Sequence, residues 1–277
     1  MMPDSLELGL LEGPLLVFGG PYSNAQATEA LIATAARLGI PPDRCICTGD
    51  VVAYCAGAKA TTDLIRNFGC PVVLGNCEES LGNSADDCGC GFEDGTACDL
   101  LSKQWYAHAQ GQLSADDRAW MASRPRRICF THAGKRVVAI HGAWAGGPQA
   151  INQFLFKSSP DAAFAAEFDA LEADIVLAGH SGLPFSKQMD GRLWLNAGVI
   201  GMPANDGSPA TWFLMIDESG NHSFHRLVYD QAGAASAMRL ADLSEGYASG
   251  LETGLWPNLD ILPPLETKQA GLPLELS

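Results

Sequence analysis

Basic residues are scarce in this chain of 277 residues. It has 17 Lys and Arg against 32 Asp and Glu, which gives a formal net charge of −15 at pH 7 and a pI near 4.6. General binding to nucleic acids or to anionic membranes needs a basic surface, so this balance argues against both. A bound metal ion would still allow the protein to act on a phosphate group, because the ion supplies positive charge locally.

Long apolar runs are also absent from the sequence. No stretch approaches the roughly 20 apolar residues of a membrane-spanning helix, and residues 1–7 lack the basic patch and apolar core of a signal peptide. We therefore expect a cytoplasmic protein. Hydrophobic residues make up 47% and charged residues 18%, which is typical of a folded globular chain. The nine cysteines are then expected to be mostly reduced thiols, and their odd number argues against a complete disulfide framework.

Strands and helices alternate in the first third of the chain. Apolar runs predict buried strands at residues 15–20, 45–48 and 71–74, and amphipathic helices between them at 25–38 and 58–68. This β-α-β-α-β order implies a parallel sheet with helices on its faces.

The pattern changes after residue 78. Residues 79–98, rich in Gly, Asp and Cys, are predicted to form a long loop, and such loops are often functional. We expect helices at 97–109, 115–123, 162–171 and 231–243, a hairpin over 127–141, and strands at 173–180, 192–196, 211–217 and 223–229. Residues 152–156 are more readily explained as a packed helix than as the wall of a cleft. We predict one domain with a two-sheet core over residues 14–243, followed by a surface-packed tail over 244–277.

Polar side chains beside a glycine follow four of the predicted strands. They are Asp50, Asn76, His141 and His180. Each alone is better explained as a turn residue or a hydrogen-bonded core residue than as a ligand. Together they favour a common site, because the carboxyl edge of a sheet is where α/β proteins bind ligands. One carboxylate, one amide oxygen and two imidazoles form a ligand set that suits Mn, Fe or Zn.

The order and spacing of these residues resemble those of the calcineurin-like metallophosphoesterases, in particular their small bacterial phosphodiesterase-type members. The family pattern is D-x-H, G-D, G-N-H-D/E, H-G and G-H-x-H. Its last four motifs are matched, in whole or in part, by residues 49–50 (Gly-Asp), 75–78 (Gly-Asn-Cys-Glu), 141–142 (His-Gly) and 179–182 (Gly-His-Ser-Gly). The resemblance covers roughly residues 14–243. It implies an α/β fold of four layers, α/β/β/α, with two mixed sheets flanked by helices, and hydrolysis of phosphate monoesters or diesters at a metal site.

The departures from the family pattern concentrate on one half of the site. Residues 20–22 read Gly-Pro-Tyr where the family has D-x-H, and Gly182 replaces the second His of G-H-x-H. The resemblance thus implies that the first metal keeps only Asp50 among its usual protein ligands. We expect one retained metal site rather than a normal two-metal centre, with the ligands Asp50, Asn76, His141 and His180.

The resemblance also implies a catalytic His beside the scissile phosphate, and Cys77 stands in its place. A thiol is a poor general acid, but when ionised it is a good ligand or nucleophile. Cys77 and His141 are therefore the candidate catalytic residues. Glu78 is either a hydrogen-bond partner that supports a ligating His or a solvated loop acid.

Other side chains offer a way to rebuild the missing half of the metal centre. Thiolates together with imidazoles suit Zn or Fe, and a tyrosine can bind a ferric ion. The candidates are Tyr22, Cys77, Cys88 and Cys90. The alternative is that these cysteines are simply small buried apolar side chains.

The leading hypothesis is a metal-dependent phosphoesterase with one conventional Fe, Mn or Zn site and a remodelled first site, acting on a phosphate-containing small molecule or a phosphoprotein. A rival of another class is a catalytically impaired protein that binds a phosphorylated ligand or partner. A third hypothesis, a redox sensor that uses Cys88 and Cys90, rests on their spacing alone.

Overall fold

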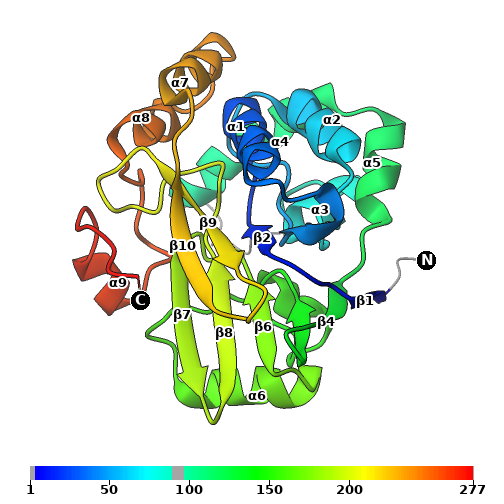
Figure 1. Ribbon diagram of the computed structural model, residues 1–277. Coiled ribbons are helices and arrows are strands. Elements are labelled where there is room, and N and C mark those ends of the chain that lie inside the picture. Colours follow the sequence, from blue (N-terminus) through cyan, green and yellow to red (C-terminus); the bar gives the residue numbers. More distant parts are fainter. Residues whose placement is uncertain (1–3, 89–96, 277) are drawn as a thin grey trace.

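The computed structural model describes residues 4–88 and 97–276. Two β-sheets lie face to face at its centre, and helices cover both outer faces (Figure 1). Within the described residues, no helix combines the length and the apolar character that crossing a bilayer requires.

The larger sheet has six strands in the order β1-β4-β5-β6-β8-β7. These strands are β1 (Ser5–Leu10), β4 (Arg127–His132), β5 (Lys135–Ala139), β6 (Ile175–Ala178), β7 (Pro184–Met189) and β8 (Arg192–Ala197). β4 and β5 form the predicted antiparallel hairpin. β5, β6 and β8 run parallel, so the chain leaves β5 and β6 at the same edge of the sheet.

The smaller sheet has four strands in the order β10-β9-β2-β3. They are β2 (Leu15–Phe18), β3 (Cys45–Cys47), β9 (Thr211–Ile216) and β10 (His222–Leu227). β2 and β3 are parallel, as expected, but β9 pairs antiparallel with both β2 and β10, so the sheet is mixed. The strand expected at 71–74 is reduced to a single parallel bridge between Cys47 and Val72.

The helices begin and end largely where local signals place them. They are α1 (Ala25–Leu38), α2 (Ala58–Phe68), α3 (Asn76–Gly82), α4 (Ala97–Gln112), α5 (Ala115–Ala122), α6 (Asp161–Leu171), α7 (Gln231–Leu240), α8 (Glu245–Thr253) and α9 (Pro264–Lys268), with short 3₁₀ helices η1 (Pro42–Arg44) and η2 (Pro148–Asn152). Asn24 caps α1, since its Oδ1 accepts a hydrogen bond from the backbone N–H of Ala27 at 3.0 Å. α1 ends at Gly39, whose φ of +69° closes the last turn.

Three apolar layers account for the four-layer arrangement. Along β2, Leu15 and Val17 pack between the two sheets, whereas Leu16 and Phe18 face α1 and α2. On the far side of the larger sheet, Phe164 and Phe168 of α6 pack against Trp194 of β8. Because β2 is buried on both faces, it reads in the sequence as a continuous apolar run. The predicted α/β/β/α arrangement is confirmed.

Residues after 243, expected as a tail packed on the surface, contain helices. They form α8 and α9, and α8 lies beside α7 (Figure 1). Tyr247, Ala248 and Leu251 of α8 are buried in the same apolar layer as α1. This segment therefore belongs to the core and also, as described below, to the site.

Candidate metal centre

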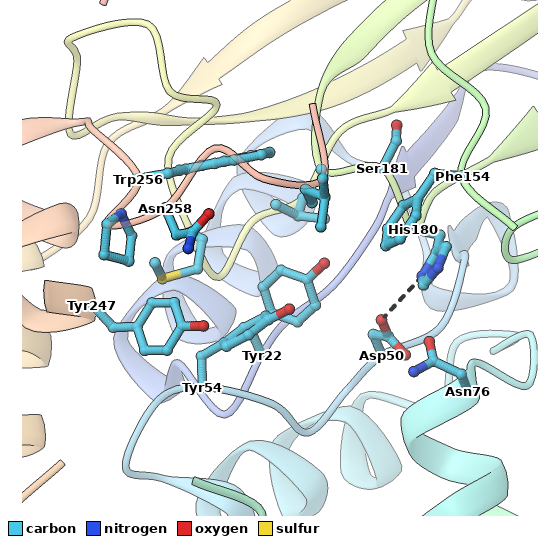
Figure 2. Close-up of a pocket in the computed structure, with 15 residues that line it drawn as sticks. Tyr22, Asp50, Tyr54, Asn76, Phe154, His180, Ser181, Tyr247, Trp256 and Asn258 are labelled. Carbon is cyan, nitrogen blue, oxygen red and sulfur yellow. Dashed lines mark ion pairs between the residues drawn. The ribbon is translucent and has the colours of Figure 1, made fainter. Parts of the chain in front are cut away.

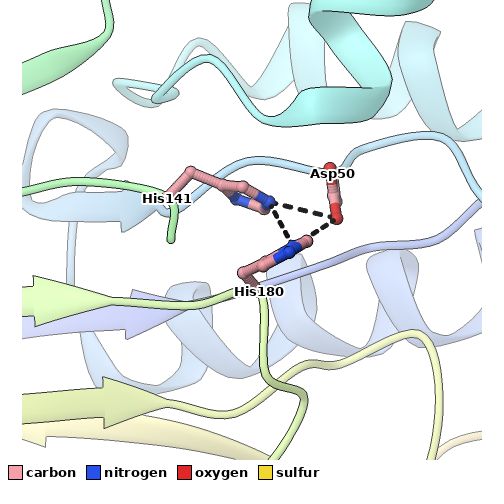
Figure 3. Close-up of side chains that lie close together, drawn as sticks. All are labelled: Asp50, His141 and His180. Atoms are coloured by element: carbon pink, nitrogen blue, oxygen red, sulfur yellow. Dashed lines mark hydrogen bonds and ion pairs between the residues drawn. The ribbon is translucent and has the colours of Figure 1, made fainter. Parts of the chain in front are cut away.

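Asp50, His141 and His180 converge where edges of the two sheets meet (Figure 3). His141 and His180 each lie two residues beyond the ends of β5 and β6, and Asp50 lies three residues beyond β3. His141 Nε2 lies 3.0 Å from His180 Nδ1 and 3.3 Å from Asp50 Oδ2. The separation of His180 Nδ1 from Asp50 Oδ2 is 3.9 Å.

Asn76, the first residue of α3, completes the set. Its Oδ1 lies 3.1 Å from His141 Nε2. Its amide nitrogen donates to the carbonyl oxygen of Cys88 at 3.2 Å, which turns the oxygen toward the centre. The structure thus brings together all four residues that the sequence predicts as ligands.

The spacing of these atoms suits one metal ion. Ligand atoms that bind one ion at about 2.1 Å lie roughly 3–3.4 Å apart, which matches three of the four separations. Within the described part of the chain, Asp50, His141 and His180 form the one group of three or more His, Cys, Asp or Glu side chains placed to hold a metal. The donor set fits a divalent ion that accepts mixed nitrogen and oxygen ligands.

His141 is held by a backbone carbonyl that the sequence did not point to. Its Nδ1 lies 2.7 Å from the carbonyl oxygen of Thr48 and donates its proton there. The lone pair of Nε2 is then available to the centre. The contact also ties the edge of the larger sheet to that of the smaller one.

Glu78 holds the turn that carries Asp50. The carboxylate is fully buried and accepts three backbone N–H groups, those of Asp50 at 2.7 Å, Val51 at 2.7 Å and Gly75 at 2.9 Å. Glu78 therefore supports the backbone of a ligand rather than a histidine, and it is not a solvated acid. Gly49, with a φ of +99°, leaves room here, because a Cβ would lie 2.9 Å from His141 Nδ1.

Burial and neighbouring charges shift the pKa of each titratable group at the centre. Burial alone would raise the pKa of Asp50, but the charges and hydrogen bonds of His141 and His180 outweigh it and lower the pKa well below its usual range. Burial, then the negative charge of Asp50, raises the pKa of Glu78 to about 7. Burial alone would lower the pKa of His141, but the charge and hydrogen bond of Asp50 outweigh it and raise the pKa. At His180 burial is the larger effect, and the pKa is lowered. The anionic form of Asp50 is thus favoured at the centre.

His180 is held in position by an aromatic neighbour. Phe154 stacks on its imidazole, with ring centroids 4.2 Å apart and an angle of 7° between the planes. The 3₁₀ helix η2 ends at Asn152, and Phe154 lies in the segment without helix that follows it. The packed helix expected over residues 152–156 is therefore wrong. A stacked aromatic carries no local sequence signal, and for that reason the sequence did not reveal its role.

The additional candidate ligands fall outside the cluster or outside the described residues. Cys77 and Cys88 are buried, and neither is part of the cluster. Cys88 contributes its backbone carbonyl to Asn76, as noted above, and Cys90 lies outside the described residues. The Sγ of Cys77 lies 3.7 Å from the Asn76 amide nitrogen, and Cys77 does not line the adjoining pocket. The loop expected from residue 79 begins later, because α3 continues to Gly82.

A pocket of about 80 Å³ opens beside the centre (Figure 2). Asp50, Asn76 and His180 form one end of it, and Tyr22 also lines it. The pocket is completed by residues beyond 243, namely Tyr247, Trp256, Pro257, Asn258 and Ile261. A phosphate ester can therefore reach the polar end of this pocket while the rest of the ligand contacts the C-terminal segment.

Comparison with known proteins agrees with this arrangement. The calcineurin-like phosphoesterase superfamily domain matches residues 23–219, which include all four candidate ligands. The chain belongs to this superfamily. Its members are hydrolases of phosphate esters that bind divalent metals.

The chain also resembles individual proteins at low sequence identity. The chain is 24% identical over 237 residues to an uncharacterized protein of Methanocaldococcus jannaschii, an alignment that covers 80% of this chain and 90% of the relative. It resembles a metallophosphoesterase of Sphaerobacter thermophilus with a TM-score of 0.68 and 20% identity, over 88% of this chain and 100% of that one. It also resembles a hypothetical protein of Pyrococcus horikoshii OT3 with a TM-score of 0.74 and 16% identity, over 88% of this chain and 99% of that one. At these identities the two structures support the fold alone.

Proposed function

We propose that this protein hydrolyses phosphate esters with one metal ion held by Asp50, Asn76, His141 and His180. The observation that supports this most directly is the convergence of His141 Nε2 with donor atoms of the other three residues at 3.0–3.3 Å, at the end of an open pocket. The superfamily supplies the reaction class. Fe, Mn and Zn suit the mixed ligand set, and the substrate is a phosphate-containing small molecule.

The residues of the chain have separate tasks in this proposal. A bound divalent ion supplies the positive charge that attracts a phosphoryl group and makes a water molecule more acidic. Asp50 contributes a negative charge and a ligand oxygen, and Glu78 fixes the backbone from which that carboxylate extends. His141 offers Nε2 because its Nδ1–H donates a hydrogen bond to the carbonyl oxygen of Thr48. Phe154 keeps the plane of His180 fixed.

The test is turnover of bis-(4-nitrophenyl) phosphate with added Mn²⁺, Fe²⁺ or Zn²⁺. We expect metal-dependent hydrolysis that falls more than about 100-fold in Asp50→Asn, since even residues that only support a ligand cost 10–100-fold when replaced. Asp190→Asn is the matched control, because Asp190 also has a positive φ, of 48°, and lies exposed in the turn between β7 and β8. Absence of turnover with every ion, or equal activity of the two variants, would refute the proposal.

A second candidate function is binding of a phosphorylated ligand or partner without turnover. It is supported by the position of Cys77, which replaces the expected catalytic His but is buried and does not line the pocket. Under this alternative, a phosphate-containing ligand binds to the metal-loaded protein, no ion gives hydrolysis, and His141→Ala changes binding only. Isothermal titration calorimetry beside the hydrolysis assay distinguishes the two.

A further inference from the structure

The pocket beside the metal centre has two chemically different ends. Figure 2 shows Asp50, Asn76 and His180 at one end, and the side chains of Tyr22, Tyr54 and Trp256 away from them. The aromatic end consists of Tyr22, Tyr54, Tyr247 and Trp256. Its layout suits a ligand that has one anionic group and one flat apolar group.

Tyrosines from three parts of the chain form one wall of the aromatic end. Tyr54 is central, with its ring centroid 4.8 Å from that of Tyr22 and 4.9 Å from that of Tyr247. On another side it contacts Trp105 of α4, at 5.5 Å. Trp105 is almost fully buried, so this wall is anchored in the core rather than free to move.

Trp256 forms the opposite wall and is fixed at both ends. Its indole Nε1 donates to the carbonyl oxygen of Pro203 at 2.6 Å, and its backbone N–H donates to Asn205 Oδ1 at 2.9 Å. The ring packs on Gly182, where a Cβ would lie 3.1 Å from Cζ2 of the indole. Although both polar groups are engaged, Trp256 is only half-buried and lines the pocket. A fixed, partly open indole provides a preorganised stacking surface.

The residues that replace family ligands lie in this same region. Tyr22 occupies the place of the His of D-x-H, and Gly182, which replaces the second His of G-H-x-H, is covered by Trp256. The half of the site in which the sequence lacks metal ligands is thus the half in which the structure has aromatic rings. The two changes are connected, because the indole of Trp256 packs directly against the glycine.

The size of the pocket limits the group that it can take. Its volume of about 80 Å³ has room for roughly five to eight water molecules, at 10–15 Å³ each. This is less than the cavity of about 150 Å³ that encloses one benzene ring, so the pocket contacts part of a ligand rather than enclosing the whole of it. One aromatic ring with a phosphate group fits this space better than a fused ring system.

We infer that the aromatic end is a subsite for a single planar ring, so that the preferred substrates are phosphate esters of an aromatic alcohol or of a one-ring nucleoside. The ring stacks between Trp256 and the tyrosine wall while the phosphate reaches the centre formed by Asp50, Asn76 and His180. This inference rests on the proposed function for the position of the phosphate. It adds that the C-terminal segment, which carries Tyr247 and Trp256, selects the organic part of the ligand.

Ligand binding to the Mn²⁺-loaded protein tests the subsite without any turnover. Isothermal titration calorimetry compares phenylphosphonate and the non-hydrolysable 5′-phosphonate analogue of uridine monophosphate with methylphosphonate, which has no ring. We expect at least one aromatic compound to bind roughly 5- to 100-fold more tightly, the range for stacking of one base on an aromatic side chain. Whichever aromatic compound binds more tightly shows whether the subsite prefers a simple aryl group or a nucleoside. Equal affinities for all three compounds would overturn the inference.

Variants of Trp256 then locate the preference. Trp256→Leu keeps an apolar side chain but loses the ring, and we expect it to lose most of the preference for the aromatic compound. Trp256→Phe is expected to retain it, which separates loss of stacking from local unfolding. Leu255→Ala is the matched control, since Leu255 is the preceding residue, is 43% exposed and does not line the pocket. Full preference in a folded Trp256→Leu variant would contradict the assignment.

The two proposals fail in different ways. Preference for aromatic phosphonates without hydrolysis of any ester would leave the subsite in place and refute the proposed hydrolysis. Hydrolysis of phosphate esters with equal kcat/KM for aryl and methyl substituents would leave the reaction in place and refute the subsite.

Discussion

Asp50 and His180 both adopt left-handed backbone conformations, with φ of +57° and +60°. Residues other than glycine rarely adopt this region, and holding one there costs of the order of 1–3 kcal/mol. Such a conformation persists only where neighbours hold it, and at Asp50 the neighbour is Glu78 through three backbone N–H groups. The geometry of the centre therefore depends on a residue that contacts neither the pocket nor the metal-binding atoms.

Replacing Glu78 with Gln tests this dependence. The amide nitrogen cannot accept a hydrogen bond, so at least one of the buried N–H groups of Asp50, Val51 and Gly75 loses its partner. We expect the free energy of unfolding to fall by about 1–3 kcal/mol and metal affinity to weaken roughly 10- to 100-fold. Urea denaturation and metal titration measure the two effects.

Glu79→Gln provides the control for that variant. Glu79 is the next residue, is partly exposed, and pairs with Arg126 at 3.0 Å. A surface pair of this kind contributes no more than about 1 kcal/mol. Equal metal affinity in Glu78→Gln and Glu79→Gln would show that the buried carboxylate does not support the centre.

The sequence predicts the ligand side chains of the centre better than the groups that orient them. Asp50 and His180 stand out because each follows an apolar strand and a glycine. The carbonyl oxygens of Thr48 and Cys88 leave no such signal, because every residue has a carbonyl group. Their roles follow from tertiary contacts alone.

Secondary structure elements were predictable where their signals are local. α1 and α2 have the expected bounds, because each ends at a glycine with positive φ, Gly39 or Gly69. β1 and β7 were missed, and both are edge strands of the larger sheet. An edge strand is half-exposed and can hold polar residues or proline, as β7 does at Pro184, so neither shows a clear apolar period. α3 was expected to be loop beyond residue 78, but Glu78 closes its first turn.

α6 secures the segment that follows His141. Oε2 of Glu167 accepts the backbone N–H groups of Trp144 and Ala145, at 2.7 and 3.2 Å. Burial raises the pKa of Glu167, and these two hydrogen bonds offset only part of that rise. Because this carboxyl holds its proton more tightly in the folded chain, its contribution to stability is fully present below its ordinary pKa of about 4.3 and is lost as the pH rises through the raised value.

Glu167→Gln removes this titration. Relative to the variant, the free energy of unfolding of the wild type should fall as the pH rises from about 4 to about 7. Urea denaturation of both proteins at the two pH values measures the trend. Glu172→Gln, an exposed change at the end of the same helix, controls for the loss of one charge. A difference that stays constant, or that grows in favour of the wild type, would contradict the argument.

At the scale of the whole molecule, the site is assembled from both ends of the chain. Asp50 and Tyr54 come from the first quarter, whereas Tyr247 and Trp256 come from residues beyond the domain limit of 243 that the sequence suggested. The repeated Pro, Gly and Leu of the last residues have no helical period, so their place over the pocket could not be predicted. The motif residues identify the metal centre, and long-range packing supplies the pocket.

Because the chain is strongly negative, the proposed function depends on a bound cation. A chain with a net charge of −15 repels an anionic substrate unless positive charge is present at the site. In this proposal one ion supplies that charge, and the aromatic end of the pocket takes the space next to it. The central prediction is therefore that one metal ion binds to each chain.

Elemental analysis of the protein, purified without chelator and after equilibration with Mn²⁺, Fe²⁺ or Zn²⁺, tests that claim most directly. We expect a metal-to-chain ratio near one with at least one of these ions, falling toward zero in His141→Ala and unchanged in Asp190→Asn. A ratio near zero with every ion, or a ratio near two, would contradict a single site formed by Asp50, Asn76, His141 and His180.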